Sequence, residues 1–189
     1  MRDEVPLVTA LRELLAFLAR RKTDYMILGG MAIRTLAIPR PTFDLDLMVA
    51  VDEAEAASFA RAADEAGFTV DEPHLRGFVD HLKGLAKLAL LVPVNERAVP
   101  VDVFLTGTDY QRAAFARRQR HETDLGPLWL ITPEDLLLHK LLADRPRDRA
   151  DVADLLLVCG PLDEPYLKRW AAALGIPARL DRALAEGRL

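Results

Sequence analysis

Apolar residues in the first two thirds of the chain follow two different spacings. Leucines recur every three or four positions between residues 7 and 21, whereas a short apolar run at 25–28 ends at two glycines. The first spacing places apolar side chains on one face of a helix, and the second is typical of a buried strand. The same patterns predict further helices at 31–38, 52–67 and 109–121, strands at 43–51, 68–70, 87–94, 98–105 and 128–132, and a loop at 71–84.

Two prolines mark the strands predicted at 87–94 and 98–105. The three polar residues between these runs predict that the two strands pair with each other. Pro93 and Pro100 lack the amide hydrogen that a sheet ladder requires. We therefore expect at least one of the two strands near a sheet edge.

The pattern after residue 132 is helical throughout, with helices predicted at 133–144, 147–159, 163–174 and 177–186. Thr132 is a suitable N-cap for the first of these helices, and Pro133 suits its first position. The sequence therefore predicts a mixed α/β (α+β) fold. A small mixed β-sheet core flanked by helices spans 1–132, and a C-terminal helical region spans 133–189.

Composition limits the classes of protein that fit this pattern. The 189 residues are 51% hydrophobic and carry a net charge of −4, which favours a packed core and disfavours non-specific nucleic-acid binding. Cys159 is the single cysteine, so neither a disulfide framework nor a cysteine-based zinc site can form. The N-terminal residues lack a signal-peptide pattern, and no apolar run is long enough to span a membrane. We expect a cytoplasmic protein.

Two acids interrupt the strand predicted at 43–51. Alternation along a strand places Asp44 and Asp46 on one face and Leu45 on the other. Two ionised carboxylates in a partly apolar setting repel each other, and a divalent cation such as Mg²⁺ removes that conflict. The alternative is that both acids face solvent on an edge strand.

Asp102 is a third acid within a predicted strand. Combined with Asp44 and Asp46 it would complete a triad able to hold two cations, as in phosphoryl or nucleotidyl transfer. The alternative is an ordinary outward-facing polar residue. Gly29 and Gly30 lie between a predicted strand and a predicted helix, where backbone amides can approach a phosphate. A tight turn explains the glycines equally well.

Charged residues also interrupt the helices predicted after residue 132. Lys140 falls within an apolar stripe, so its amine either reaches out to solvent or points at a ligand. Asp148 and Asp151 precede apolar positions by one turn and border the buried face of their helix. The alternative is an acidic helix N-terminus with surface ion pairs. The four histidines show no ligand spacing, and we expect them on the surface or in the core.

The order of these parts resembles the DNA polymerase β-like nucleotidyltransferase superfamily. Its signature is an apolar residue, Gly-Gly or Gly-Ser, a gap and then two acids one residue apart, as in GGMAIRTLAIPRPTFDLDL at 29–47. The text PEDLLLHKLLADRPRDRADVADL at 133–155 resembles the AbiEii-type branch, which contains abortive-infection and toxin–antitoxin toxins. Gly-Gly also occurs in antibiotic-modifying nucleotidyltransferases of the lincosamide type. The resemblance covers residues 25–158.

The resemblance implies a role for each matching residue of the core. Gly29 and Gly30 would hold the phosphates of an NTP substrate. Asp44, Asp46 and Asp102 would bind Mg²⁺ or Mn²⁺, and Asp102 could also act as general base for the incoming hydroxyl.

The resemblance also implies roles for residues outside that triad. Lys140 would contact the triphosphate, and either Asp148 or Asp151 would be the functional acid of the helical region, which completes the active site. Arg40 and Thr42 would support the loop before the paired acids and contribute to the NTP site.

The implied activity is Mg²⁺-dependent transfer of NMP from an NTP to a hydroxyl, with release of pyrophosphate. The acceptor would be RNA such as tRNA, a protein or a small molecule, and a toxin would have a cognate antitoxin as partner. RNA is favoured if a basic rim converges on the site, formed by Arg112, Arg117, Arg118, Arg120, Arg145, Arg147 and Arg149. The alternatives are a non-catalytic nucleotide-binding or antitoxin-like protein on the same fold, an antibiotic-modifying nucleotidyltransferase of the lincosamide type, and a hydrolase or unrelated α/β protein whose acids are structural.

Overall fold

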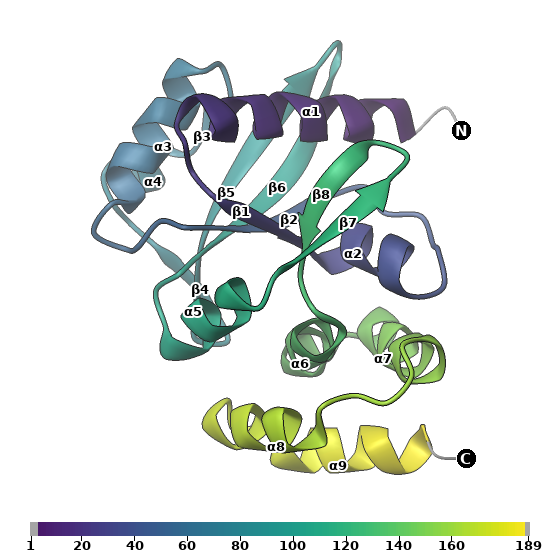
Figure 1. Cartoon of the computed structure of the whole chain (residues 1–189). Coiled ribbons are helices and arrows are strands. Elements are labelled where there is room, and N and C mark those ends of the chain that lie inside the picture. Colours follow the sequence, from purple (N-terminus) through teal and green to yellow (C-terminus); the bar gives the residue numbers. More distant parts are fainter. Residues whose placement is uncertain (1–3, 188–189) are drawn as a thin grey trace.

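The computed structural model describes residues 4–187, and it has the mixed α/β architecture expected from the sequence (Figure 1). The N-terminal part contains α1 (Glu4–Arg20), β1 (Tyr25–Leu28), α2 (Gly29–Leu36), β2 (Leu45–Val49), α3 (Ala56–Glu65), β3 (Thr69–Val70), α4 (Glu72–Leu75), β4 (Asp80–Leu82), β5 (Leu85–Val94), β6 (Arg97–Leu105), α5 (Asp109–Ala116), β7 (Gln119–Thr123) and β8 (Gly126–Leu130). The helices that follow are α6 (Pro133–Ala143), α7 (Pro146–Val158), α8 (Glu164–Ala173) and α9 (Pro177–Glu186).

A single mixed sheet of eight strands organises the described residues. Its order is β3-β5-β6-β2-β1-β8-β7, and β4 pairs with the start of β5. The pairs β2–β6 and β1–β8 are parallel, whereas β1–β2, β5–β6 and β7–β8 are antiparallel. β2 is therefore a central strand with a partner on each side, so Asp46 does not lie on a sheet edge, whereas Asp44 precedes the strand and is exposed.

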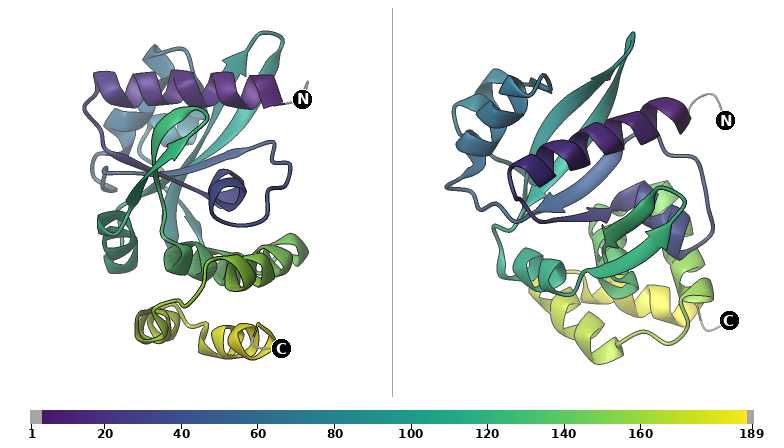
Figure 2. Two further views of the ribbon diagram at one scale, coloured as in Figure 1. Left: turned by 45° about the vertical axis from the view of Figure 1, so that its right-hand side comes forward. Right: turned by 45° about the horizontal axis from the view of Figure 1, so that its top comes forward.

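The sheet separates two apolar layers. Leu47 and Val49 of β2 belong to the cluster that contains α1 and α3, whereas Met48 between them belongs to the cluster that contains α6–α9. Figures 1 and 2 show α1 across one side of the sheet and α6–α9 on the other side. Because side chains alternate along a strand, Asp46 shares the face of Met48 and is directed toward the helical layer.

The predicted helix at 109–121 is wrong at its C-terminal end. α5 ends at Ala116, and residues from Gln119 onward form β7, which pairs with β8 from Gln119–Leu130 to Thr123–Gly126. Strand pairing thus overrides the helical pattern. The segment at 71–84, expected to be a loop, contains the short helix α4 and strand β4.

Both prolines lie where a strand has a neighbour on one side. Pro93 faces Ala98, and Pro100 faces Leu91, within the β5–β6 pair. β3 pairs with β5 only at Leu90 and Leu91, and β2 meets β6 from Val101 onward. The edge prediction therefore holds for the ends of β5 and β6, although both strands are interior elsewhere.

The helices after residue 132 are confirmed within a few residues. Thr132 caps α6 through a hydrogen bond that its hydroxyl accepts from the Asp135 amide. One apolar cluster runs from β1 through α6 to α9, so the helical region packs directly on the sheet. The boundary between 1–132 and 133–189 stays a prediction. Within residues 4–187, no helix has the length and apolar character needed to cross a membrane.

Candidate functional site

We call Asp44, Asp46 and Asp102, all predicted to lie on strands, the strand acids. Two of them are direct neighbours in the sheet. The parallel register of β2 and β6 places Asp46 opposite Asp102, and the antiparallel register of β1 and β2 places Leu28 opposite Asp46. Paired residues on adjacent strands project from the same face. Asp44 lies just before β2, because this strand begins at Leu45 rather than at residue 43 as predicted.

Asp46 is the acid of this group whose pKa is shifted. Burial, together with the neighbouring charges of Asp44 and Asp102, raises its pKa from 3.8 to about 6. The positive charges of Lys140 and Arg145 act in the opposite direction without cancelling this effect. A carboxyl group surrounded by like charges is a favourable place for an added cation.

Asp44 and Asp102 each have a polar partner. The hydroxyl of Thr42 donates to Asp44 Oδ1 at 2.7 Å. Lys87 Nζ donates to Asp102 Oδ1 at 2.8 Å from the adjacent strand β5. Neither partner contacts Asp46 in the same way, so the central acid of the three is the one whose charge is least balanced.

Gly29 and Gly30 make room for two of these side chains. Gly29 begins α2 with φ +62°, and a Cβ atom there would overlap the carboxyl group of Asp46. A Cβ atom at Gly30 would overlap the side chain of Thr42, which is buried. The glycines therefore allow β2 and the loop before it to approach α2. Their predicted contact with phosphates is not tested by this packing.

A second charged cluster lies in the helical layer. Lys140 Nζ is 3.0 Å from Asp148 Oδ1 and 2.7 Å from Asp151 Oδ2, and all three side chains are buried. Arg145 Nε donates to Asp148 Oδ2 at 2.7 Å, and Arg40 Nε donates to Asp151 Oδ1 at 2.6 Å. We call Arg40, Lys140, Arg145, Asp148 and Asp151 the ion-pair cluster.

The pKa values of the cluster acids move in the opposite direction to that of Asp46. Burial acts to raise the pKa of Asp148 and Asp151, but hydrogen bonds and charge from Arg145, Arg40 and Lys140 outweigh it and lower both values. The amine of Lys140 thus pairs with two carboxylates inside the protein and does not reach out to solvent. The structure does not choose between Asp148 and Asp151 as the functional acid, because Lys140 contacts both.

A cavity joins the strand acids to the ion-pair cluster. It is lined by Leu28, Gly29, Asp46, Leu82, Asp102, Phe104, Leu136, His139, Lys140, Ala143 and Arg145. The structure therefore brings together the Gly29 backbone, two strand acids and Lys140, as the sequence predicts. Its walls from β4, β6 and α6 are partly apolar, and its volume of about 50 Å³ is small for a whole organic ligand.

His139, expected from the sequence on the surface or in the core, is buried and lines the cavity. Its ring packs against Phe104 and Tyr110, and its Nε2 atom has no hydrogen-bond partner among the described residues. Burial lowers the pKa of His139 to about 4, with a further contribution from Lys140, so the ring is neutral at physiological pH. Its place one residue before Lys140 was the only signal in the sequence.

The strand acids do not form a ready-made metal site. Within residues 4–187, no three histidine, cysteine, aspartate or glutamate side chains are arranged to hold a metal ion. One carboxylate oxygen of Asp44 accepts from Thr42, and one of Asp102 accepts from Lys87. Carboxylate oxygens are nevertheless the ligands that Mg²⁺ prefers, and the unbalanced charge at Asp46 fits a cation. Metal binding by Asp44, Asp46 and Asp102 stays a prediction.

The arginines proposed as a basic rim are dispersed over the surface. Several pair locally: Arg112 with Asp109, Arg117 with Glu134, Arg118 with Asp24, Arg120 with Glu122 and Arg149 with Asp144. Arg145 is the member of this set that lines the cavity. Convergence of the rim on the site, which would favour RNA, is not observed.

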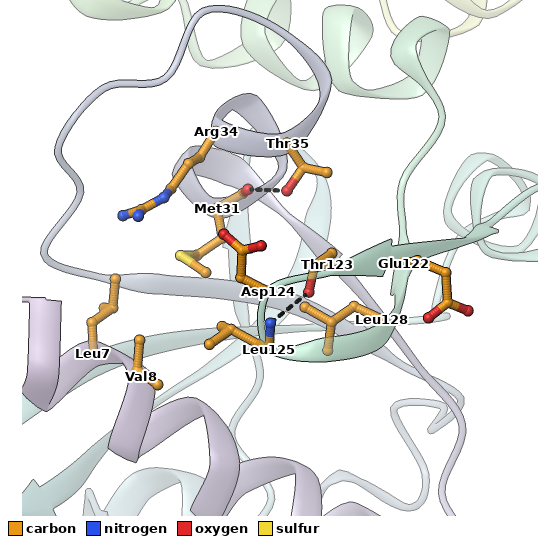
Figure 3. Close-up of a pocket in the computed structure, with 10 residues that line it drawn as sticks. All are labelled: Leu7, Val8, Met31, Arg34, Thr35, Glu122, Thr123, Asp124, Leu125 and Leu128. Atoms are coloured by element: carbon orange, nitrogen blue, oxygen red, sulfur yellow. Dashed lines mark hydrogen bonds between the residues drawn. The ribbon is translucent and has the colours of Figure 1, made fainter.

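A separate hollow of about 260 Å³ lies between α1, α2 and the β7–β8 hairpin. Figure 3 shows Leu7, Met31 and Leu128 at this hollow, and all three belong to the apolar cluster on the α1 side of the sheet. Asp46 projects from the opposite face of the sheet. The hollow is therefore distinct from the cavity that holds the acids.

No protein-family model and no curated protein sequence matches this chain. Solved structures with a similar fold include an antigenic nucleotidyltransferase-like protein from Paracoccidioides brasiliensis. It is 21% identical at a TM-score of 0.50, over 82% of this chain and 73% of that one. The lincosamide antibiotic adenylyltransferase LnuA, bound to lincomycin, is 15% identical at a TM-score of 0.51, over 78% and 94%.

The antibiotic-resistance factor ANT(2'')-Ia is similar over almost the whole length of both chains. It is 18% identical at a TM-score of 0.53, and the match covers 96% of each chain. Similarity at these identities establishes the fold and does not by itself carry an activity. The AbiEii-type branch is not among these neighbours and stays a prediction. What the comparisons establish is that this chain has the fold of nucleotidyltransferase-like proteins.

Proposed function

We propose that this chain is an NTP-dependent nucleotidyltransferase. It would transfer NMP from an NTP to an acceptor hydroxyl and release pyrophosphate. The observation that carries the proposal is the pairing of Asp46 with Asp102 on adjacent strands, in a cavity that Lys140 also lines. The raised pKa of Asp46 supports the same conclusion, because perturbed acids in a cavity are typical of functional sites.

In this proposal the strand acids hold Mg²⁺ or Mn²⁺ through Asp44, Asp46 and Asp102. The cation, when bound, neutralises phosphate charge and favours departure of pyrophosphate. Asp102 is also placed to accept the proton of the acceptor hydroxyl once it is released from Lys87. Deprotonation of the hydroxyl makes its oxygen the nucleophile for the α-phosphorus.

The positively charged residues of the cavity would position the triphosphate. Lys140 and Arg145 line the same cavity as Asp46, and their positive charge lies near its carboxyl. An ammonium and a guanidinium both bind phosphate oxygens, the second with a fixed fork of donors. Gly29 begins α2 and has no side chain, so a phosphate would be able to approach the backbone amide there.

For the acceptor we propose a hydroxyl-bearing small molecule. One structural neighbour is described with lincomycin bound, and another with adenylyl-2''-tobramycin. In this chain the cavity walls are partly apolar, and Arg112, Arg117 and Arg118 pair with acids of the chain rather than lining the cavity, which favours a small acceptor over an RNA backbone. Transfer to tRNA or to a protein, with a cognate antitoxin as partner, is the alternative that the experiment separates.

The test offers the purified protein each α-labelled NTP with Mg²⁺ or Mn²⁺. Aminoglycosides and lincosamides, total RNA and protein extract are supplied as separate acceptors. The double variant Asp44→Asn, Asp46→Asn is the inactive control. Asp109→Asn is its matched control, because Asp109 is an exposed acid on α5 that pairs only with local groups.

We expect label in a small-molecule fraction with wild type and Asp109→Asn, and none with the double variant. Label in RNA or protein with the same dependence on the acids would keep the enzyme class and replace the acceptor. No transfer to any acceptor, combined with Mg²⁺-dependent NTP binding, would support the non-catalytic alternative. Absence of both transfer and binding would overturn the proposal.

A further inference from the structure

We propose that Asp151 is a positioning residue that sets the place of Asp44 through Arg40. The inference deepens the proposed function and rests on it for its catalytic consequence. Asp151 lies on α7, whereas Arg40 and Asp44 lie in the loop between α2 and β2. The helical region would therefore hold part of the strand-acid site in place from outside the cavity.

The contact between Arg40 and Asp151 fixes both distance and orientation. Arg40 Nε donates to Oδ1 at 2.6 Å, and Nη2 donates to Oδ2 at 2.7 Å. Two parallel hydrogen bonds from a planar guanidinium to a carboxylate define one geometry. The side chains are 20% and 1% exposed, so water screens the pair far less than it would a surface ion pair.

The loop that Arg40 holds is otherwise open to solvent at several positions. Pro39 and Pro41 are exposed, and Phe43 is 66% exposed although it is a large apolar residue. Thr42, two residues after Arg40, is buried against Gly30 and donates to Asp44. A displacement of Arg40 would thus reach Asp44 through one short and continuous stretch of chain.

Asp151 also holds the amine that lines the cavity. Lys140 Nζ lies 2.7 Å from the same Oδ2 atom that accepts from Arg40 Nη2. One carboxylate therefore connects the loop of Asp44 to Lys140 on α6. Asp148 provides a natural control, because it hydrogen-bonds to Lys140 and Arg145, whereas the hydrogen-bonded acid of Arg40 is Asp151 and Asp148 acts on Arg40 only through its charge.

The experiment compares Asp151→Asn with Asp148→Asn in two measurements. Hydrogen exchange followed by mass spectrometry reports the mobility of residues 37–44, with no need for activity. The Mg²⁺ concentration that half-activates NMP transfer reports the metal site. We expect Asp151→Asn to accelerate exchange in 37–44 and to raise the half-activating concentration by about 10- to 100-fold. Asp148→Asn should leave exchange of this segment at the wild-type rate.

Arg40→Gln provides a second variant that leaves α7 and Lys140 unchanged. It should reproduce the accelerated exchange of Asp151→Asn, and the double variant should exchange no faster than either single variant. Unchanged exchange in both single variants, or equal acceleration in Asp148→Asn, would overturn the positioning role. Accelerated exchange in a protein whose wild type transfers no NMP would keep the positioning role and remove only the proposed function.

Discussion

Asp46 on β2 and the two acids of α7, Asp148 and Asp151, carry the same carboxyl group, but their surroundings shift its pKa in opposite directions. Asp46 is half-buried beside two other carboxylates, and its pKa is raised to about 6. Asp148 and Asp151 are buried, but arginine and lysine partners lower the pKa of both below the ordinary value of 3.8. Both groups face Lys140, which lies at their boundary.

This difference separates two acids whose charge is balanced within the chain from one acid whose ionised form the fold disfavours. The charges of Asp148 and Asp151 are balanced within the chain, so their role in the fold needs nothing from solution. The charge of Asp46 is not balanced, and the folded protein destabilises its ionised form. A cost of this kind is typical of functional sites, where a ligand supplies the missing charge.

The largest effect is expected from Asp46→Asn. The substitution removes the central negative charge while leaving the shape of the side chain, so NMP transfer should fall by more than about 10²-fold. Stability should be kept or increased at neutral pH, because the unfavourable ionised carboxyl is gone. The rate of transfer and the midpoint of urea unfolding check the two parts separately. Wild-type turnover in this variant would remove Asp46 from the site.

The same variant should lose a pH dependence of stability. The folded state binds the Asp46 proton more tightly than the unfolded chain, so the stability this proton confers is complete below pH 3.8 and disappears as pH rises through about 6. A shift of this size corresponds to about 3 kcal/mol. Urea unfolding from pH 4 to 7 should show this decline in wild type and a flatter profile in Asp46→Asn. Parallel profiles would contradict the raised pKa.

The next effect is expected from Gly29→Ala. The added methyl group would overlap the carboxyl of Asp46, and the positive φ at this position is unfavourable for alanine by about 1–2 kcal/mol. Transfer should therefore fall sharply, while the midpoint of thermal unfolding falls by several degrees. Gly67→Ala is the control, because Gly67 also has positive φ but has open space around it. Equal activity loss in both variants would assign the effect to backbone strain alone.

Patterns that are local in the chain were readable from the sequence. The buried strand at 25–28, the Thr132 cap and the helices that follow are set by neighbouring residues, and the structure confirms them. The end of α5 was not readable, because the partner that converts Gln119 and its successors into a strand is β8. A preference for pairing that depends on a later segment leaves no local mark.

The candidate site divides in the same way. Glycines and paired acids mark it in the sequence, because their spacing is short. The contact between Arg40 and Asp151 joins residues 111 positions apart, so no local spacing predicts it. The packing of Gly29 against Asp46 is equally long-range in cause, since it depends on the register of β1 and β2. The place of His139 in the cavity was not predicted, because its burial and its unpaired Nε2 atom are properties of the folded chain.

A smaller effect, opposite in pH dependence to that of Asp46→Asn, is expected from Asp148→Ala. Asp148 has a lowered pKa, so it contributes stability above its unfolded value of 3.8, and this is lost as pH falls through the folded value. Removing hydrogen bonds to Lys140 and Arg145 should cost about 2 kcal/mol at neutral pH. Urea unfolding should show the variant approaching wild type only at acidic pH. A constant difference across pH would mean that packing, rather than charge, accounts for the loss.

The smallest effect is expected from Lys87→Met. This substitution removes the positive partner of Asp102, so Asp102 becomes unbalanced like its neighbour Asp46. Lys87 donates to Asp102 at 2.8 Å, so its ammonium competes with any cation that Asp102 is to bind. Removing one charge at this range through solvent corresponds to about 1 kcal/mol, or roughly a fivefold gain in Mg²⁺ affinity. Titration of transfer against Mg²⁺ should therefore half-saturate at a lower concentration. A higher half-saturating Mg²⁺ concentration would show instead that Lys87 holds Asp102 in its metal-binding orientation. The ion pair between Lys87 and Asp102 would then be part of the site rather than a competitor of the cation.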